Sequence, residues 1–341
     1  MSRFSSRVGC GTAMLAIAAL SAAAAEPLRL GVIGLDTSHS IAFTKMLNLA
    51  DAADHVPGAR VVVASPRGSA DIPSSISRVP EYTEAIKGLG VEIVDSVEAL
   101  VPRVDAVLLE SNDGRVHLEQ ALPVLQAGKR LFIDKPVAGS LADTIAIFRL
   151  AEHYKVPVFT SSALRFAAGT VAVRGGSLGA VVGCDTYSPC EIEKTHPDLF
   201  WYGVHGCEAL YTVMGTGCES VARVHADDAD IVTGLWSGGR IGTFRGLRRS
   251  AGGFGGTAFG AQGIAAVGAF DGYRPLVVEI VRFFESGVPP VEPAETIELF
   301  AFMEAADESR RRDGARVPLA DVMRKAEAEA ERIVAKVLDG R

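Results

Sequence analysis

The sequence has few of the residues that mark several specialised classes of protein. Five cysteines in 341 residues are too few for a disulfide scaffold. Lys and Arg number 34 against 41 Asp and Glu, and no basic block occurs, so we expect no nucleic-acid partner. With 48% hydrophobic and 22% charged residues, the chain is globular rather than disordered or collagen-like, and its length indicates two domains.

The first 25 residues have the pattern of a secretory signal. Arg3 and Arg7 precede a short apolar run from residue 13 to residue 20, and Ala23 and Ala25 suit a cleavage site. The run is shorter than the roughly 20 residues that a spanning helix needs, although an uncleaved anchor is the alternative. We therefore expect an exported protein, periplasmic or extracellular, without a membrane association after cleavage.

The cysteines leave two possibilities for the exported chain. Cys10 is removed with the signal, and four cysteines remain. In an oxidising compartment a Cys184–Cys190 or a Cys207–Cys218 bridge is one expectation. Buried free thiols are the other.

Residues 26–162 alternate between short apolar strands and helices. This alternation predicts βαβ units and a doubly wound parallel sheet. A capping box formed by Ser140 and Asp143 predicts a helix over residues 140–154. Residues 65–80 are rich in Ser, Pro and Gly, and we expect a loop there.

The pattern changes near residue 165. Strands with few helices between them predict an open, mainly antiparallel sheet, and the Gly-rich residues 250–268 predict hairpin turns or bulged strands. One helix is expected over residues 201–214, and two or three helices close the chain. The expected organisation is a signal peptide at 1–25, a doubly wound domain at 26–162 and an α+β domain at 163–341.

The turn after the first strand departs from the dinucleotide fingerprint G-x-G-x-x-G. Gly34 is present, but Asp36 and His39 replace the second and third glycines. A carboxylate repels a pyrophosphate, and a Cβ obstructs its approach. Asp36 therefore caps the following helix, with Thr37 and Ser38 as rival caps, or coexists with a shifted cofactor, or marks a site that has lost the dinucleotide.

The end of the second strand bears on the choice of cofactor. It carries Ser65 and Arg67, and no acid stands there to bind a ribose 2′-hydroxyl. These two residues suit a 2′-phosphate, so NADP is favoured over NAD if a dinucleotide binds.

Two further segments carry a resemblance to a known family. Residues 104–112 end in Ser111 and Asn112, His117 follows, and residues 134–136 read Asp-Lys-Pro. Together with the strand–turn start, this resembles the Gfo/Idh/MocA family of sugar-type dehydrogenases, in which an acidic-Lys-Pro motif ends the fifth strand. In the second domain, residues 200–208 resemble the family segment D-x-G-x-H-x-x-D. Gly203 and His205 match, whereas Trp201 and Glu208 replace the two acids.

The resemblance implies a Rossmann domain followed by an open-sheet domain, with substrate held between that sheet and a nicotinamide. It implies that Lys135 orients a substrate hydroxyl and that His205 is an acid or base. The expected cofactor-binding residues are Gly34, Asp36, Thr37, Ser38, His39, Ser65, Arg67, Ser111, Asn112, His117, Asp134, Lys135 and Pro136. The expected substrate-binding residues are Arg165, Trp201, Tyr202 and Glu208.

Helical spacing supports part of this set. In a helix over 201–214, Trp201, His205 and Glu208 share one face, and Tyr202 lies near it. A carboxylate would then orient the histidine, and the rings would stack on a sugar. Arg165, which follows the sixth strand, would meet a carboxylate or hydroxyl. His205, Cys207 and Glu208 do not form a closed ligand set, so no metal is expected.

We therefore expect an NAD(P)-dependent oxidoreductase that acts on a sugar or polyol derivative. Because free nicotinamide nucleotides are not expected outside the cytoplasm, an exported member would have to retain its cofactor. An NAD-dependent glycosidase with retained cofactor is the enzymatic alternative. A non-redox carbohydrate-binding protein on the same scaffold is the other alternative. By resemblance we expect a homodimer or homotetramer.

Overall fold

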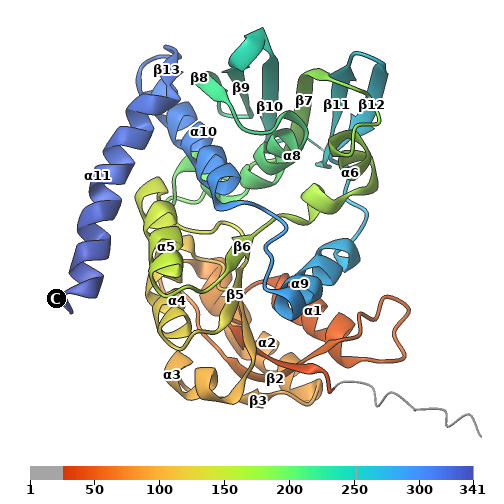
Figure 1. The fold of residues 1–341 in the computed structure, drawn as a ribbon, viewed down its shortest axis with the longest axis vertical. Coiled ribbons are helices and arrows are strands. Elements are labelled where there is room, and N and C mark those ends of the chain that lie inside the picture. Colours follow the sequence, from red (N-terminus) through yellow and green to blue (C-terminus); the bar gives the residue numbers. More distant parts are fainter. Residues whose placement is uncertain (1–25, 251, 341) are drawn as a thin grey trace, which may run out of the picture.

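The computed structural model describes residues 26–250 and 252–340, so the predicted signal segment lies outside the described residues. Two sheets lie one above the other, with helices around them (Figure 1). Within the described ranges, no helix is both long enough and apolar enough to cross a bilayer.

The lower sheet in Figure 1 is parallel and has six strands. Its strands are β1 (Leu28–Ile33), β2 (Ala59–Ser65), β3 (Glu92–Ile93), β4 (Ala106–Leu109), β5 (Arg130–Ile133) and β6 (Val158–Thr160). The order is β3-β2-β1-β4-β5-β6, so the direction of winding reverses between β1 and β4. The loops after these two strands diverge, which creates a crevice at the carboxyl ends of the strands.

Helices cover both faces of this sheet. They are α1 (Ser38–Asn48), α2 (Pro73–Gly88), α3 (Val97–Leu100), α4 (His117–Gln126) and α5 (Leu141–His153), with 3-10 turns at Val101–Arg103 and Gly114–Val116. Ser140 caps α5 as predicted, because its Oγ accepts a hydrogen bond of 3.0 Å from the Asp143 amide. The expectation of a loop over residues 65–80 is wrong in its second half. Pro73 begins α2, where the fixed φ of proline suits the first helical turn, and the helix continues through Pro80.

The second sheet has seven strands and is mainly antiparallel, as predicted. Its strands are β7 (Val181–Pro189), β8 (Cys218–Ala226), β9 (Ala229–Trp236), β10 (Ile241–Leu247), β11 (Gly255–Gly260), β12 (Gly263–Val267) and β13 (Val317–Pro318). The order is β12-β11-β7-β10-β9-β8-β13, and only β7 and β10 pair in parallel. The Gly-rich stretch forms the β11–β12 hairpin.

The helices of the second half are α6 (Ala168–Arg174), α7 (Asp198–Trp201), α8 (Val204–Met214), α9 (Arg274–Ser286), α10 (Pro293–Arg311) and α11 (Leu319–Leu338), with 3-10 turns at Ala163–Phe166 and Ser237–Gly239. The single helix expected over 201–214 is therefore wrong. The chain breaks at Tyr202 and Gly203 between α7 and α8. A side chain at position 203 would come within 2.9 Å of the Cys190 sulfur, so only glycine fits this close approach.

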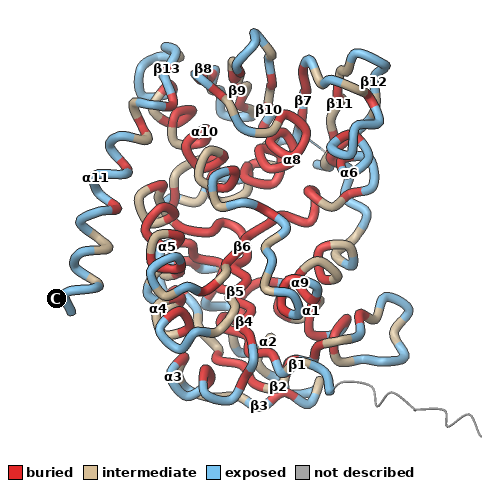
Figure 2. Tube along the Cα trace, viewed as in Figure 1, coloured by how far each residue is buried: buried red, intermediate tan, exposed pale blue. Residues whose placement is uncertain are grey.

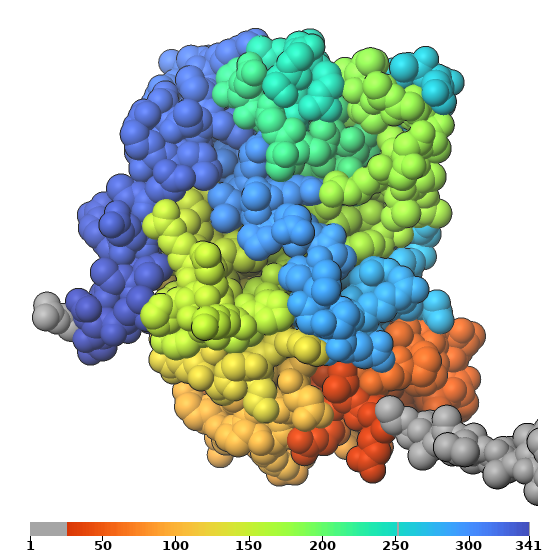
Figure 3. Space-filling model, viewed as in Figure 1, coloured from red at the N-terminus to blue at the C-terminus, as the bar shows by residue number. Residues whose placement is uncertain are grey.

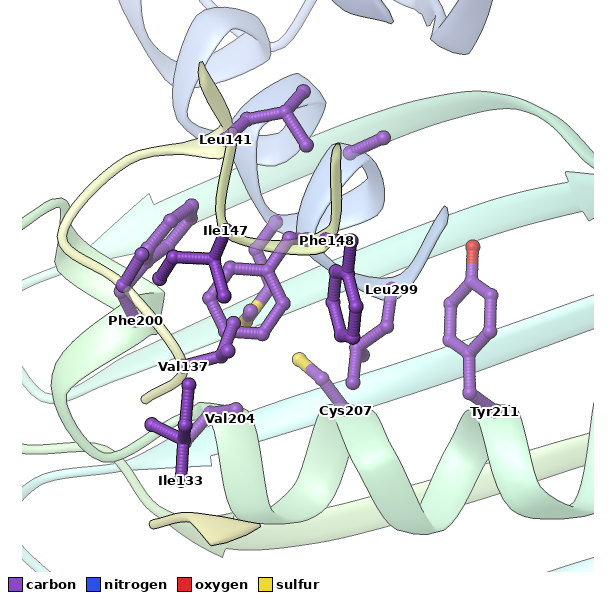
Figure 4. Close-up of a cluster of buried hydrophobic side chains, with 14 of the residues drawn as sticks. Ile133, Val137, Leu141, Ile147, Phe148, Phe200, Val204, Cys207, Tyr211 and Leu299 are labelled. Atoms are coloured by element: carbon purple, nitrogen blue, oxygen red, sulfur yellow. The ribbon is translucent and has the colours of Figure 1, made fainter. Parts of the chain in front are cut away.

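One apolar core joins the two domains. Ile133 and Val137, which flank the Asp-Lys-Pro segment, pack in the same cluster as Val204 and Cys207 of α8 (Figure 4). Figure 2 shows both the strands of the parallel sheet and α8 as mostly buried. Because this core is continuous, it holds the end of β5 and the start of α8 in a fixed relation.

The C-terminal part of the chain returns to the first domain. Ile280 and Phe283 of α9 pack against Phe132 and Phe159 of the parallel sheet. In Figure 3 this blue segment lies against the red and yellow parts of the chain. The predicted division at residue 162 therefore describes the order of the sheets, but α9 helps to cover the first of them.

The four described cysteines are buried free thiols, so neither expected disulfide is present. Burial raises the pKa of Cys184 and of Cys190 to about 12. These groups remain protonated near neutral pH and are poor nucleophiles.

Candidate active site at the carboxyl edge of the parallel sheet

A cavity of about 360 Å³ lies between the carboxyl edge of the parallel sheet and the start of α8. Eight of the residues singled out in the sequence line it: Thr37, Ser38, His39, Asn112, Lys135, Trp201, Tyr202 and His205. The first five come from the turns after β1, β4 and β5 and from the first residues of α1, and the last three come from α7, the break after it and α8. The structure thus brings the Asp-Lys-Pro segment and the second-domain motif to one site.

Lys135 enters the cavity directly after β5. Its side chain is largely buried, and Nζ lies 5.7 Å from the centre of the Tyr202 ring. The negative face of an aromatic ring attracts an ammonium group at this distance. Tyr202 therefore helps to hold the ammonium group over the cavity.

His205 lies in the first turn of α8. Its Nδ1 is 2.8 Å from the hydroxyl of Ser162, and the rings of Tyr202 and Phe254 lie 5.0 and 5.8 Å away. Burial lowers the pKa of His205 well below its usual value, and the charge of Lys135 adds to this effect. His205 is therefore a neutral imidazole near pH 7.

Glu208 does not contact His205 directly, which corrects the expectation from helical spacing. Its carboxylate accepts hydrogen bonds from Ser161 Oγ at 2.8 Å, from the Ser162 amide at 2.7 Å and from Arg165 Nε at 2.7 Å. Arg165 also pairs with Glu295 at 2.6 Å and does not line the cavity. Arg165 and Glu208, both expected to bind substrate, are instead buried in an ion-pair network behind the cavity wall. This network fixes the position of Ser162, and Ser162 in turn contacts His205.

His39 pairs with the acid of the Asp-Lys-Pro segment. Its Nδ1 lies 2.7 Å from Asp134 Oδ2, and Asp134 is completely buried. The His39 ring stacks on Phe43 at 5.3 Å and meets the edge of Tyr273 at 4.7 Å. The residue that replaces the third glycine is thus part of the cavity wall with a carboxylate behind it.

A second buried acid lies beside this pair. Glu110 follows β4. A ring nitrogen of His39 and carboxylate oxygens of Glu110 and Asp134 lie within 4.8 Å of one another. Both oxygens of Glu110, and Oδ1 of Asp134, have no hydrogen-bond partner among the described residues. Burial and the neighbouring Asp134 raise the pKa of Glu110 well above its usual value.

A smaller cavity of about 230 Å³ lies on the other side of the crevice, lined among others by Asp36, Arg67, Ser69, Ser111 and Gln120. It sits between the ends of β2 and β4, where open α/β sheets bind the adenosine half of a dinucleotide. The hydroxyl of Ser65 and Nε of Arg67 are buried and lack a partner within the described ranges. Such unpaired donors fit the ribose and phosphate oxygens of a nucleotide.

Asp36 stands between the two cavities. It accepts hydrogen bonds from the Asn112 amide at 2.9 Å and from the Ser75 hydroxyl at 2.5 Å. Thr37, not Asp36, caps α1, because the Thr37 hydroxyl oxygen accepts from the His39 amide at 3.0 Å. The carboxylate thus ties the β1–α1 turn to the start of α2 and to the loop after β4, where a pyrophosphate joining the two cavities would have to pass. The two cavities fit the adenosine and nicotinamide ends of a dinucleotide. The pyrophosphate between these ends fits only if the Asp36 carboxylate turns away.

Gly34 and His117 shape the crevice without facing either cavity. Gly34 has a φ of 92°, and a side chain there would come within 2.4 Å of the Ser111 amide nitrogen. The ring nitrogens of His117 lie 2.8 and 3.2 Å from the carbonyl oxygens of Ser111 and Val137. His117 is fully buried, so it holds the ends of β4 and β5 together and does not reach a ligand.

Several cavity residues were not foreseen from the sequence: Ser74, Arg78, Ser162, Glu191, Phe254, Phe270 and Tyr273. Most come from loops or from the hairpin region, where no motif marks them. Glu110 could have been recognised, because it ends an apolar strand beside the strand that ends in Asp134. The carboxyl ends of neighbouring parallel strands meet at one edge of the sheet.

Residues 29–162 match a family model described as an oxidoreductase family with an NAD-binding Rossmann fold. The model is that of the Gfo/Idh/MocA family, to which this part of the chain is therefore similar. The resemblance seen in the sequence is thereby confirmed for the first domain, which is that of an NAD-binding oxidoreductase. A search of curated proteins gives no match.

Solved structures extend the likeness to the whole fold. A probable dehydrogenase from Thermotoga maritima superposes with a TM-score of 0.70 at 22% identity, covering 86% of this chain and 100% of that one. The scyllo-inositol dehydrogenase of Lactobacillus casei with NAD(H) and scyllo-inositol gives 0.69 at 14% identity, with coverage of 86% and 100%. An oxidoreductase from Agrobacterium radiobacter in complex with NAD+, L-tartaric acid and magnesium gives 0.69 at 15% identity, covering 86% and 99%. At these identities the likeness shows the fold.

Proposed function

We propose that the protein is an NAD(P)-dependent oxidoreductase that acts on a sugar or polyol derivative bound in the larger cavity. The observation that carries this proposal is the meeting of Lys135 and His205 in one cavity, at the carboxyl edge of an NAD-binding Rossmann domain. The similar inositol dehydrogenase, solved with NAD(H) and scyllo-inositol, supports a polyol as the substrate class.

The cavity wall suits a molecule with several hydroxyl groups. Trp201, Tyr202 and Tyr273 supply ring faces on which a sugar can stack, and Asn112 and Glu191 supply polar groups at the wall. Apolar surface combined with a few well-placed polar groups is the usual composition of a small-molecule site. Arg78 adds a positive charge, which suits a carboxylated sugar or polyol.

Within this cavity the chain's own groups bind, orient and activate a hydroxyl. A bound nicotinamide supplies or accepts hydride. The Lys135 ammonium stabilises the negative charge that grows on the hydroxyl oxygen as its proton leaves. The neutral His205 accepts a hydrogen bond from a substrate hydroxyl, and the surrounding rings exclude water.

The nucleotide is proposed to be NADP rather than NAD. The support is that Arg67 lines the smaller cavity with its Nε unpaired among the described residues, that Ser65 ends β2 with an unpaired hydroxyl, and that no carboxylate ends β2. An Arg at this place accommodates a 2′-phosphate, whereas an acid would bind the free 2′-hydroxyl.

The test is a screen of polyols, cyclitols, aldoses and aldonates, followed by absorbance of the reduced nicotinamide. Lys135→Ala should lower kcat/KM by about 100-fold or more, because it removes the charge that stabilises the developing oxyanion. Lys325→Ala, on the exposed side of α11, is the matched control and should keep full activity. Full activity of Lys135→Ala would contradict the proposed role.

Asp36 favours a second candidate, a carbohydrate-binding protein that has lost the dinucleotide. Denaturing the purified protein and identifying any released nucleotide by mass spectrometry separates the two. Stoichiometric NAD or NADP supports the oxidoreductase. Empty protein that also fails to bind added nucleotide supports the binding protein. Hydrolysis of a nitrophenyl glycoside without added cofactor would instead indicate a glycosidase that retains its nucleotide.

We also propose that the chain is exported after cleavage before Glu26. The support is the signal pattern of residues 1–25. Cell fractionation with mass spectrometry of the mature N-terminus tests this, and an intact Met1 in the cytoplasmic fraction would contradict it.

A further inference from the structure

We propose that His39, held by Asp134, is the group that exchanges a proton with the substrate in the larger cavity. This inference rests on the proposed function and identifies its acid–base residue. The resemblance of the second-domain motif pointed to His205 for that role, but the two histidines differ in what lies behind them.

The contact between His39 and Asp134 has the geometry of a catalytic dyad. Nδ1 lies 2.7 Å from Oδ2, and neither partner is more than slightly exposed. A carboxylate in this position fixes the ring and its tautomer, and it stabilises the imidazolium that forms when the ring takes a proton. Phe43 and Tyr273 hold the plane of the ring.

The second ring nitrogen of His39 is available to a ligand. His39 lines the cavity together with Lys135 and His205. Within the described part of the chain, Asp134 supplies the one hydrogen bond to the ring, at Nδ1. When Nδ1 carries its proton toward Asp134, Nε2 has a free lone pair for a substrate hydroxyl.

His205 lacks such a partner. Its Nδ1 contacts the Ser162 hydroxyl, and among the described residues no carboxylate forms an ion pair with it. Burial and the Lys135 charge oppose a positive charge on its ring, and the more distant Asp134 offsets them only in part, so the pKa of His205 is lowered well below its usual value. A proton transferred to His205 would have no carboxylate in contact with it among the described residues, whereas a proton on His39 faces Asp134 directly. His205 therefore serves to bind a substrate hydroxyl.

Glu110 leaves Asp134 free for this role. Two adjacent buried carboxyl groups do not both ionise, because like charges repel strongly away from water. Burial raises the pKa of Glu110, as does the neighbouring Asp134. Burial also opposes ionisation of Asp134, but the hydrogen bond from His39 and the neighbouring Lys135 ammonium favour the carboxylate, and the pKa of Asp134 is lowered. The pair thus holds one proton, on Glu110.

The other charged or titratable groups that face His39 are Lys135, His205 and Tyr273. The Lys135 ammonium opposes positive charge at this place, and the Asp134 carboxylate in contact with Nδ1 is what offsets this for an imidazolium at His39. A metal would displace Asp134 from His39.

In the oxidative direction the substrate alcohol loses a proton and a hydride. The substrate O–H bond breaks, and the proton moves to Nε2 of His39, which becomes an imidazolium paired with Asp134. The C–H bond on the same carbon breaks, and its hydrogen leaves with the electron pair to an oxidised nicotinamide as co-substrate. A carbonyl group forms beside Lys135. In the reductive direction the imidazolium returns the proton.

The first experiment reads the tautomer of His39 and needs no substrate. Long-range proton–nitrogen correlation spectra of protein labelled with 15N-histidine, assigned with His39→Gln, should show Nδ1 protonated and Nε2 unprotonated. In Asp134→Asn this fixed tautomer should be lost. A wild-type His39 with its proton on Nε2 would overturn the proposal, whether or not the protein proves to be a dehydrogenase.

The second experiment uses a substrate from the screen. His39→Gln and Asp134→Asn should lower kcat by about 100-fold or more, with KM changed only a few-fold, because general acid–base catalysis is lost. His205→Gln should mainly raise KM, and His153→Gln on the exposed side of α5 should change neither. Wild-type kcat in His39→Gln would overturn the proposal. Because wild-type turnover is the reference, absence of any turnover counts against the proposed function, and the tautomer then decides the dyad alone.

Discussion

Replacing Asp36 by glycine should strengthen dinucleotide binding, although most changes in a binding site weaken it. The Asp36 carboxylate is buried and bonded to Ser75 and Asn112, at the place where a pyrophosphate must pass between the two cavities. Binding therefore requires that these hydrogen bonds break and that the carboxylate moves away, or that two like charges lie side by side.

The magnitude follows from charge and hydrogen bonding. One phosphate charge about 4 Å from the carboxylate costs about 4 kcal/mol at an effective dielectric constant near 20. Breaking the two hydrogen bonds to a charged group instead costs about 3–6 kcal/mol in total. The alternative with the lower free-energy cost sets the penalty for binding. When the carboxylate moves away, phosphate oxygens can accept hydrogen bonds from the Ser75 hydroxyl and the Asn112 amide. We therefore expect about 3 kcal/mol, or roughly 100-fold in Kd, on changing Asp36 to glycine.

The assay is calorimetric titration of the nucleotide-free protein with NADP and NAD. Asp36→Asn keeps the size of the side chain and removes its charge, so it separates repulsion from obstruction by the Cβ. Adenosine 2′-monophosphate lacks the pyrophosphate, so its affinity should change less than that of the dinucleotide among the three proteins, although Asp36 also lines the smaller cavity.

The pH dependence of dinucleotide affinity tests the same reasoning independently. Burial raises the pKa of Asp36, and the hydrogen bonds from Ser75 and Asn112 offset this only in part. As the pH falls toward that pKa, the wild type should bind dinucleotide more tightly, while Asp36→Gly should not gain in this way. Equal dinucleotide affinity of the wild type and a folded Asp36→Gly would refute the reasoning.

Four further predictions concern other parts of the molecule. Arg67→Ala should weaken NADP binding about 10-fold or more and leave NAD nearly unchanged, because only the 2′-phosphate loses a charged partner. Arg223→Ala should lower the free energy of unfolding by about 3–5 kcal/mol in urea titrations, because it strands buried carboxylates that pair with Arg223. A thiol reagent should label Cys184, Cys190, Cys207 and Cys218 only after denaturation. Ile241 is exposed on the open sheet, and Ile241→Arg places a charge on that face. If the sheet pairs two copies of the chain, this change should reduce the mass measured by light scattering. A monomeric wild type would contradict the expected dimer or tetramer.

The features predicted well from the sequence are those set by local pattern. The parallel sheet follows from short apolar strands between helices, and the start of α5 follows from Ser140 and Asp143. The break at Gly203 was missed, because helical periodicity continues through it and only the close approach of Cys190 requires glycine.

Which residues distant in the sequence become hydrogen-bond partners could not be predicted. The two partners of Asp36 lie 39 and 76 residues away in the chain. Helical spacing allowed Glu208 to face His205, yet Arg165 and the Ser162 amide compete for the same carboxylate and bind it in the fold. Which donor takes a carboxylate depends on tertiary packing, and the sequence pattern does not contain it.

The two changes in the glycine loop act on different parts of the crevice, and this separates them in function. Asp36 binds loops on the nucleotide side, whereas His39 binds Asp134 on the substrate side. If the loop were merely degenerate, neither side chain would need a buried partner with good geometry. Each has one, and His39 in addition faces the cavity that holds Lys135. The loop therefore combines a restraint on nucleotide entry with an acid–base group, and the Asp36 and His39 variants should separate nucleotide affinity from turnover.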